Sequence, residues 1–148
     1  MTDYQMAPGY TGRVFFVKVL EGSSPHRAIE EFLTDNGIEF AVIWGIGGMA
    51  WARLAVFSPE ENKYHAVDIE AEPGRVLEVA TIQGNSVLGE DGAYHTHLHA
   101  VVAKEPDKVY AGHLVDGRVH PFLELQIIEL TGAASEARKL LSHRWSRT

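Results

Sequence analysis

The sequence predicts an α+β domain built on a largely antiparallel sheet of about seven strands, with one main packed helix and a C-terminal helix. Short segments rich in β-branched and aromatic residues alternate with turn-forming residues along most of the chain. One segment, residues 25–36, instead has apolar residues at helical spacing. Many strands with one or two helices are typical of a sheet that carries its helix on one face.

The first predicted strand covers residues 12–20, and the main helix follows it directly. The strand reads GRVFFVKVL, and Ser24 and Pro25 then suit the cap and the first helical position. Asn36 and Gly37 supply a left-handed stop, so the helix is expected to end there. The apolar stripe of this helix is formed by Ile29, Phe32 and Leu33.

Two further strands, residues 38–44 and 49–57, are predicted on either side of the glycine-rich segment 45–48. These glycines do not form the G-x-G-x-x-G fingerprint, and no helical pattern follows them. A nucleotide-binding loop is therefore not predicted. A tight turn, or close packing against a neighbouring backbone, explains the glycines instead.

The second half of the chain is predicted to form a series of strands and a final helix. The strands are expected at residues 64–70, 75–83, 93–103, 109–115 and 118–130. The charged segment 104–108 contains a proline and is predicted to be a turn, and Asp116-Gly117 is typical of a two-residue hairpin turn. Pro121 indicates an edge or a bulge, and Ala134–His143 has helical composition.

Length and composition indicate one globular domain at residues 12–131, with an N-terminal extension at 1–11 and a C-terminal tail or helix at 132–148. Thirteen basic and twenty acidic residues give a net charge of −7, which disfavours a broad contact with nucleic acid or anionic lipid. Without cysteine, disulfides and thiolate metal sites are excluded, which fits a reducing compartment. Because residues 1–12 lack an apolar signal core and glycines interrupt the longest apolar stretch, we expect a cytoplasmic protein without a membrane span.

Three alternating histidines form the most informative motif of the chain. His95, His97 and His99 would all project from one face of a strand, because successive side chains point to opposite faces. Three imidazoles side by side repel one another when they are protonated, whereas neutral imidazole is the commonest metal ligand in proteins. A shared cation would therefore stabilise this arrangement.

A fourth histidine, His113, follows the predicted turn. If Ala103 pairs with Val109 across that turn, His99 lies directly opposite His113, and His97 is a diagonal neighbour. These three histidines are therefore predicted to converge on one ion, and a one-residue change of register would turn His113 to the other face. Zinc is the expected ion, although copper, nickel and iron suit the same nitrogens. Three protein ligands would leave zinc with an open position, as in catalytic sites.

The remaining histidines are given lesser roles. His95 lies nearer the strand end and is only an additional candidate ligand. His120 would face His113 if Asp116-Gly117 forms the expected turn, which makes His120 the candidate fourth ligand. Three histidines without a partner in the sequence are predicted to lie on the surface: His26, His65 and His143.

Three charged residues, Arg75, Glu78 and Glu124, are candidates for catalytic roles. Glu124 would lie roughly 13 Å beyond His120 at the usual strand rise, too far for a metal ligand within one subunit unless Pro121 marks a bulge. Glu124 could still orient an imidazole, or serve a site that another chain completes. Arg75 and Glu78 form either a salt-bridged surface pair or a substrate site, in which Arg75 holds a carboxylate and a glutamate moves a proton.

Several short motifs together resemble the PPC family, the plants and prokaryotes conserved domain. The matching pieces are Gly74-Arg75-Val76-Leu77-Glu78 with Gly84, His97-Leu98-His99, Gly112-His113-Leu114 with Gly117, and Glu124. The resemblance covers residues 12–130. Two positions depart from the family pattern, because Ala111 stands where a glycine is usual and Val76 where an aromatic residue is common.

This resemblance implies a small α+β domain of the stand-alone prokaryotic type that assembles as a homotrimer, with a metal on the matching histidines in some members. Plant relatives bind AT-rich DNA through separate AT-hooks, and this sequence has no Arg-Gly-Arg-Pro hook. The fold is also similar to that of acetolactate decarboxylase, which uses a three-histidine zinc site, although a fold alone does not assign chemistry.

Three functions are therefore considered. The first is a trimeric metal-binding protein of unassigned biochemical role. The second is a metal-dependent lyase or hydrolase that acts on a small carbonyl or carboxylate compound. The third is a DNA-associated regulatory module, whose binding to DNA would depend on salt.

Overall fold

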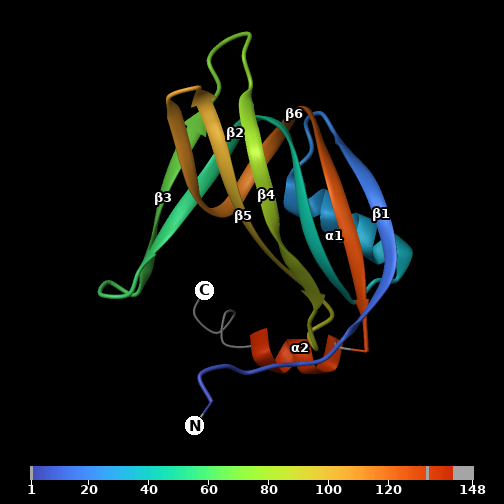
Figure 1. Cartoon of the computed structure of the whole chain (residues 1–148). Helices are drawn as coiled ribbons and strands as arrows, with labels where there is room; N and C mark the ends of the chain where they lie inside the picture. Colours follow the sequence, from blue (N-terminus) through green and yellow to red (C-terminus); the bar gives the residue numbers. More distant parts are fainter. Residues whose placement is uncertain (1, 133, 142–148) are drawn as a thin grey trace.

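The computed structural model describes residues 2–132 and 134–141, and it confirms an α+β fold with a largely antiparallel sheet (Figure 1). The elements in chain order are β1 (Tyr10–Leu20), α1 (Pro25–Asn36), β2 (Phe40–Ser58), β3 (Lys63–Glu70), β4 (Leu77–Leu88), β5 (Tyr94–Glu105), β6 (Lys108–Thr131) and α2 (Ala134–Leu141). The sheet has six strands because two pairs of expected strands are single long strands, β2 and β6.

The strands lie in the order β1-β6-β5-β4-β2-β3, and β2 also pairs with β6. The pairings from β2 through β4, β5 and β6 therefore return to β2 and form a closed ring. Closure of this kind removes exposed sheet edges. Among the strands of the described residues, β1, which pairs with β6, and β3, which pairs with β2, lie outside the ring.

The glycine-rich segment does not separate two strands, so that prediction was wrong. Residues 40–58 form one strand, in which the glycines pack against the backbone of β6. A Cβ on Gly45 would lie 2.2 Å from the Glu124 carbonyl oxygen, and one on Gly47 would lie 2.4 Å from that of Phe122. The alternative explanation, close packing against a neighbouring backbone, is confirmed.

The expected hairpin turn at Asp116-Gly117 is also absent, because β6 continues through it and stays paired with β2. A type I′ turn needs positive φ at both central residues, and neither residue has it. The Asp116 carboxylate instead accepts hydrogen bonds from the Ser24 hydroxyl at 2.9 Å and from the Gly117 N–H at 2.8 Å. Pro121 lies at an irregularity of the β2–β6 register, as the bulge prediction expected.

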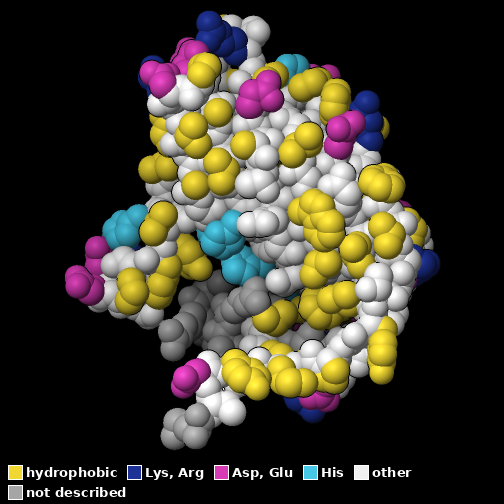
Figure 2. All heavy atoms as spheres, viewed as in Figure 1, with side chains coloured by type: hydrophobic (Ala, Val, Ile, Leu, Met, Phe, Trp, Pro, Cys, Tyr) yellow, Lys and Arg dark blue, Asp and Glu magenta, His cyan; other side chains and the backbone are white. Residues whose placement is uncertain are grey.

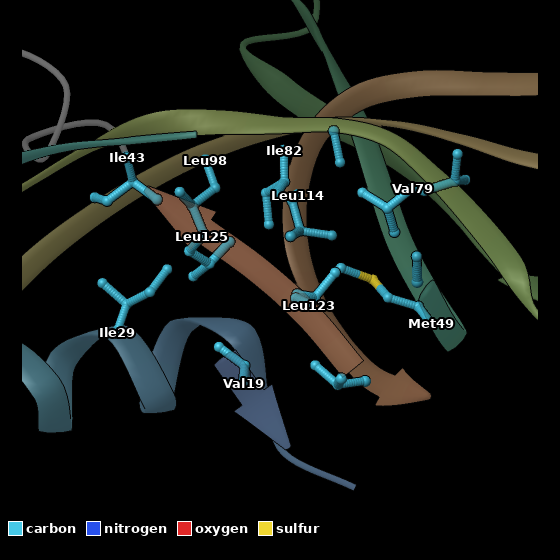
Figure 3. Close-up of a cluster of buried hydrophobic side chains, with 14 of the residues drawn as sticks. Val19, Ile29, Ile43, Met49, Val79, Ile82, Leu98, Leu114, Leu123 and Leu125 are labelled. Carbon is cyan, nitrogen blue, oxygen red and sulfur yellow. The ribbon is translucent and has the colours of Figure 1, made fainter. Parts of the chain in front are cut away.

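Helix α1 has the predicted bounds and packs its apolar stripe on the sheet. Pro25 is in the first turn, and Gly37 ends the helix in the left-handed conformation with φ of 62°. Ser24 occupies the cap position, but its side chain does not cap the helix because it bonds Asp116. Ile29 and Leu33 are fully buried, and Figure 3 shows Ile29 facing the side chains of the sheet.

A chain of polar side chains ties α1 to β5 beside the alternating histidines. The Thr96 hydroxyl donates to Glu30 of α1 at 2.8 Å, and it also lies 2.8 Å from the hydroxyl of Ser86 on β4. Ser86 is completely buried, so this contact satisfies a hydroxyl that would otherwise be costly. These hydrogen bonds anchor Thr96, which lies between His95 and His97, on the face of β5 opposite the histidines.

The C-terminal helix is present as α2, and the ion pair between Arg138 and Glu39 connects it to the start of β2. Residues 142 and 143 of the expected helix lie outside the described residues. Within the described part of the chain, no helix has the length and apolar character needed to cross a bilayer.

The close approach at Gly45 generates a stability prediction. Gly45→Ala places a methyl group against the backbone of β6, so we expect a loss of about 1–3 kcal/mol in the free energy of unfolding, as in overpacked cores. Chemical denaturation measures the change. The control is Val56→Thr, an exposed β-branched position on the same strand, which should change it by less than about 0.5 kcal/mol. Equal stabilities of wild type and Gly45→Ala would contradict the explanation.

Candidate metal centre

The predicted register of the β5–β6 hairpin is confirmed. Ala103 pairs with Val109, and His99 lies directly opposite His113. His97 is two residues before His99 on β5, so its side chain lies on the same face. Ala55 of β2 pairs with His113 from the other side, so β6 is held between two strands at this point.

The three histidines present their ring nitrogens to one another. One nitrogen from each of His97, His99 and His113 can be chosen so that all three lie within 4.8 Å of one another. The Nε2 atoms of His97 and His99 are 3.2 Å apart. Two nitrogens at 2.0–2.1 Å from a tetrahedral zinc ion lie about 3.3 Å apart, so this pair already has the spacing of zinc ligands.

The environment of His113 favours the neutral form of its ring. Burial lowers the pKa of His113 below its ordinary value of 6.5, and the nearby His99 lowers it further. The His113 Nδ1 atom is buried without a hydrogen-bond partner, and the ring of Tyr64 lies 5.2 Å away. A neutral imidazole is the form that binds metal, so these donors fit a divalent transition metal ion.

Histidine side chains gather near the centre of the face shown in Figure 2, beside a hollow and among apolar side chains. His97 and His113 are half-buried, whereas His99 is exposed. Among the described residues, no aspartate or glutamate belongs to this group of nitrogens. An ion bound there would have nitrogen ligands from the protein and would be open to solvent on one side.

Neither additional candidate ligand joins the group. His95 Nε2 lies 3.2 Å from the Asp91 carboxylate, at the loop before β5. His120 Nδ1 lies 2.6 Å from the Glu21 carboxylate. His120 does not face His113, because the expected turn at Asp116-Gly117 is absent and both residues lie on one continuous strand.

The three charged candidates lie apart from the histidines, and Arg75 and Glu78 line one pocket away from Glu124. Arg75 forms a two-bond ion pair with Glu105, at 2.6 and 2.8 Å, rather than with Glu78. Glu78 is exposed and lies opposite Ala103, near the end of β5 that is away from the histidines. Glu124 is exposed on the second half of β6, between Lys18 of β1 and Ile46 of β2.

Two neighbours of the histidines were not identified from the sequence. Asn85 lies directly opposite His97 on β4, and its Oδ1 atom is buried without a hydrogen-bond partner. Tyr64 of β3 packs on the ring of His113. The predicted strand 75–83 ends before Asn85, so this residue was not placed in the β4–β5 hairpin. The Tyr64 contact brings together β3 and β6, which are far apart in the sequence, and no local pattern indicates it.

The predicted surface position is wrong for His26. This residue is half-buried at the start of α1, and its Nδ1 atom is buried without a hydrogen-bond partner. Burial lowers the pKa of His26, Asp116 partly opposes this shift, and His113 adds to it. His65 is exposed as predicted, at 3.0 Å from the Glu61 carboxylate, and His143 lies outside the described residues.

These observations define a small α+β protein with a three-histidine candidate metal centre on its sheet. The chain belongs to the Plants and Prokaryotes Conserved (PCC) domain family, whose model matches residues 6–131. The resemblance to this plants and prokaryotes conserved family, which the short sequence motifs indicated, is thereby confirmed. No curated protein matches the sequence.

Solved structures of this family have the same fold. A plant- and prokaryote-conserved protein from Pyrococcus horikoshii is 29% identical, with a TM-score of 0.77 over 87% of this chain and 86% of that one. A protein from Archaeoglobus fulgidus described as metal-containing is 27% identical, with a TM-score of 0.79 over 88% and 89%. Acetolactate decarboxylase from Bacillus subtilis is 15% identical, with a TM-score of 0.53 over 78% and 52%, which shows similarity of fold alone.

The buried His26 generates a prediction for the metal-free protein. Burial lowers the pKa of His26 in the folded protein. As the pH falls below 6.5, the unfolded chain therefore binds a proton on His26 more readily than the folded protein does. The free energy of unfolding should therefore fall as the pH is lowered from 7 to 5, and His26→Gln should make the fall smaller. Denaturation at each pH measures it. The exposed Val56→Thr, which removes no titratable group, is the control and should keep the wild-type slope. Equal slopes for wild type and His26→Gln would contradict the prediction.

Proposed function

We propose that this chain is a cytoplasmic, homotrimeric protein that binds one divalent transition metal ion per subunit on His97, His99 and His113. One observation carries the proposal: ring nitrogens from two neighbouring strands lie within 4.8 Å of one another. The Nδ1 atom of His113 is buried without a hydrogen-bond partner, and an ion bound at that nitrogen would satisfy it.

Zinc is the first choice for the ion. Imidazole nitrogens favour zinc and other transition metals, whereas magnesium and calcium need oxygen ligands that this group does not provide. The structurally similar protein from Archaeoglobus fulgidus is described as metal-containing. A bound zinc ion would act as a Lewis acid that polarises an oxygen at its open position.

A metal-dependent lyase or hydrolase is the alternative, because three protein ligands leave one position for a substrate. In that function Arg75 would hold a carboxylate, and Glu78 or Glu124 would move a proton. The ion pair of Arg75 with Glu105 and the position of Glu124 on the far half of β6 disfavour these roles within one subunit. Binding of an ion without a dedicated proton-transfer residue is therefore the preferred proposal.

The proposed trimer would cover apolar side chains on the outer face of the sheet. Phe16 of β1 is 83% exposed and Ile46 of β2 is 54% exposed, and both point away from the core. Both lie on one outer face of the sheet, on either side of β6, where Phe16 pairs with Gln126 and Ile46 pairs with Glu124. A patch of exposed apolar side chains on one face, here interrupted by these two polar residues, marks a candidate protein–protein interface.

Nucleic acid is not part of the proposed function. The net charge is −7, and the sequence contains no AT-hook. Binding to DNA relies on basic residues that neutralise phosphates, so the third function, a DNA-associated module, has the least support.

The proposal predicts stoichiometric metal in the purified protein. After expression with zinc, elemental analysis should find about one ion per chain in the wild type. The His97→Ala, His99→Ala double variant should retain none, because a single imidazole cannot hold the ion. His65→Ala, an exposed histidine of β3, is the matched control and should keep its metal. Metal-free wild-type protein after this treatment would rule out the proposal.

The apolar patch predicts the assembly. Light scattering should give the wild type three times the mass of one chain. The Phe16→Glu, Ile46→Glu double variant should give a smaller mass, because two carboxylates cannot be buried there without partners. Val109→Glu, an exposed apolar residue at the start of β6, is the control and should remain trimeric. A monomeric wild type, or a trimeric double variant, would contradict the assignment.

A further inference from the structure

Metal binding on the three histidines does not account for one neighbouring feature, the side chain of Asn85. Its Oδ1 atom is buried and has no hydrogen-bond partner. A buried carbonyl oxygen in this condition destabilises the fold unless a donor reaches it. Asn85 faces the same side of the sheet as the histidines, because it pairs with His97 across β4 and β5. Its neighbour Gln83 pairs with His99 in the same way.

A hollow of about 390 Å³ adjoins this pair of amides. It is lined by Val42, Ile43, Trp44, Gln83, Gly84 and Asn85. Trp44 pairs with Gln83, so the indole, 43% exposed, stands on the side of the hollow away from the histidines. The hollow therefore has an aromatic wall on one side, two amides on its floor, and the candidate metal centre on the other side.

The walls carry no formal charge. All six lining residues are apolar or amide-bearing, so they favour an uncharged portion of a ligand over an ionised one. Trp44 offers a flat apolar surface of the kind on which rings pack. The unpartnered oxygen of Asn85 needs an N–H or O–H donor. One molecule would have to carry the donor, the ring and the metal-binding oxygen, and it would extend from Trp44 on β2 across β4 to the histidines on β5.

We propose that the hollow between Trp44 and Asn85 is a ligand-binding site for a small planar molecule that gives an oxygen to the metal and an N–H or O–H donor to the Asn85 Oδ1 atom. This inference rests on the proposed metal site and adds a ligand class to it. Asn85 would accept the hydrogen bond from the donor, and Trp44 would pack against the flat apolar portion of the ligand.

Three hydroxamates test this site on the zinc-loaded wild-type protein, with dissociation constants measured by calorimetry. Benzohydroxamate has the oxygens, the N–H and the ring; N-methylbenzohydroxamate lacks the N–H; acetohydroxamate lacks the ring. We expect the wild type to bind benzohydroxamate about tenfold more tightly than the N-methyl compound, as for one buried hydrogen bond. Asn85→Ala and Asn85→Leu should reduce this ratio to about one, and Trp44→Ala should remove the preference for benzohydroxamate over acetohydroxamate.

Gln126→Ala is the matched control, because this amide faces Trp44 from β6 and does not line the hollow. It should keep both preferences. A tenfold ratio that persists in both Asn85 variants would belong to the probes themselves and would overturn the inference. So would a Trp44→Ala variant that changes the oligomeric mass instead of the ring preference, because a second copy would then cover the indole.

Elemental analysis of each variant separates the two proposals. A wild type that holds zinc but binds no hydroxamate refutes the ligand site and leaves the metal site intact. A wild type that holds no zinc refutes the metal site, and the ligand site fails with it. Asn85 variants that keep stoichiometric zinc and lose only the N–H preference support the inference.

Discussion

The register between β5 and β6 is the constraint on which the candidate site depends. Side chains alternate along a strand, so a slip of one residue would move His113 to the core face and expose Leu114. Leu98, Ala100 and Leu114 are buried on the face opposite the histidines. Burying one leucine contributes about 1.5–3 kcal/mol, so the core alone makes the alternative register costly. The hydrophobic core therefore brings the histidines together before any ion binds.

Strand β6 carries this constraint to the rest of the sheet, because it pairs with β1, β2 and β5. His113 is held between His99 on one side and Ala55 on the other, so its backbone cannot shift without disturbing two strands. Farther along, Gly45 and Gly47 let β2 and β6 approach closely enough to close the ring. The glycines thus act on the site through the backbone, although they contact none of its side chains.

The features that could be predicted from the sequence depend on neighbours along the chain. The β5–β6 hairpin has a short turn and a clear alternation, and α1 has its own start and stop signals, so both were predicted correctly. Residues 45–48 and Gly117 have local signals for turns, but pairing between β2 and β6, far apart in sequence, overrides them. The burial of His26 depends on long-range packing of the same kind, which no local pattern specifies. Asn85 reaches its position opposite His97 across the β4–β5 hairpin, but it lies beyond the end of the predicted strand 75–83.

The chemistry that the site supports follows from which side chains the fold brings to it. A divalent ion on three neutral imidazoles, as proposed, keeps its full double charge, because no carboxylate among the described residues belongs to the group. Such an ion attracts an anionic or strongly dipolar oxygen. The polar groups beside it on β4 are the amides of Gln83 and Asn85, which donate and accept hydrogen bonds but do not ionise at neutral pH. The site is therefore suited to binding and polarising an oxygen, and a proton transfer would need a group from the ligand, the solvent or another chain.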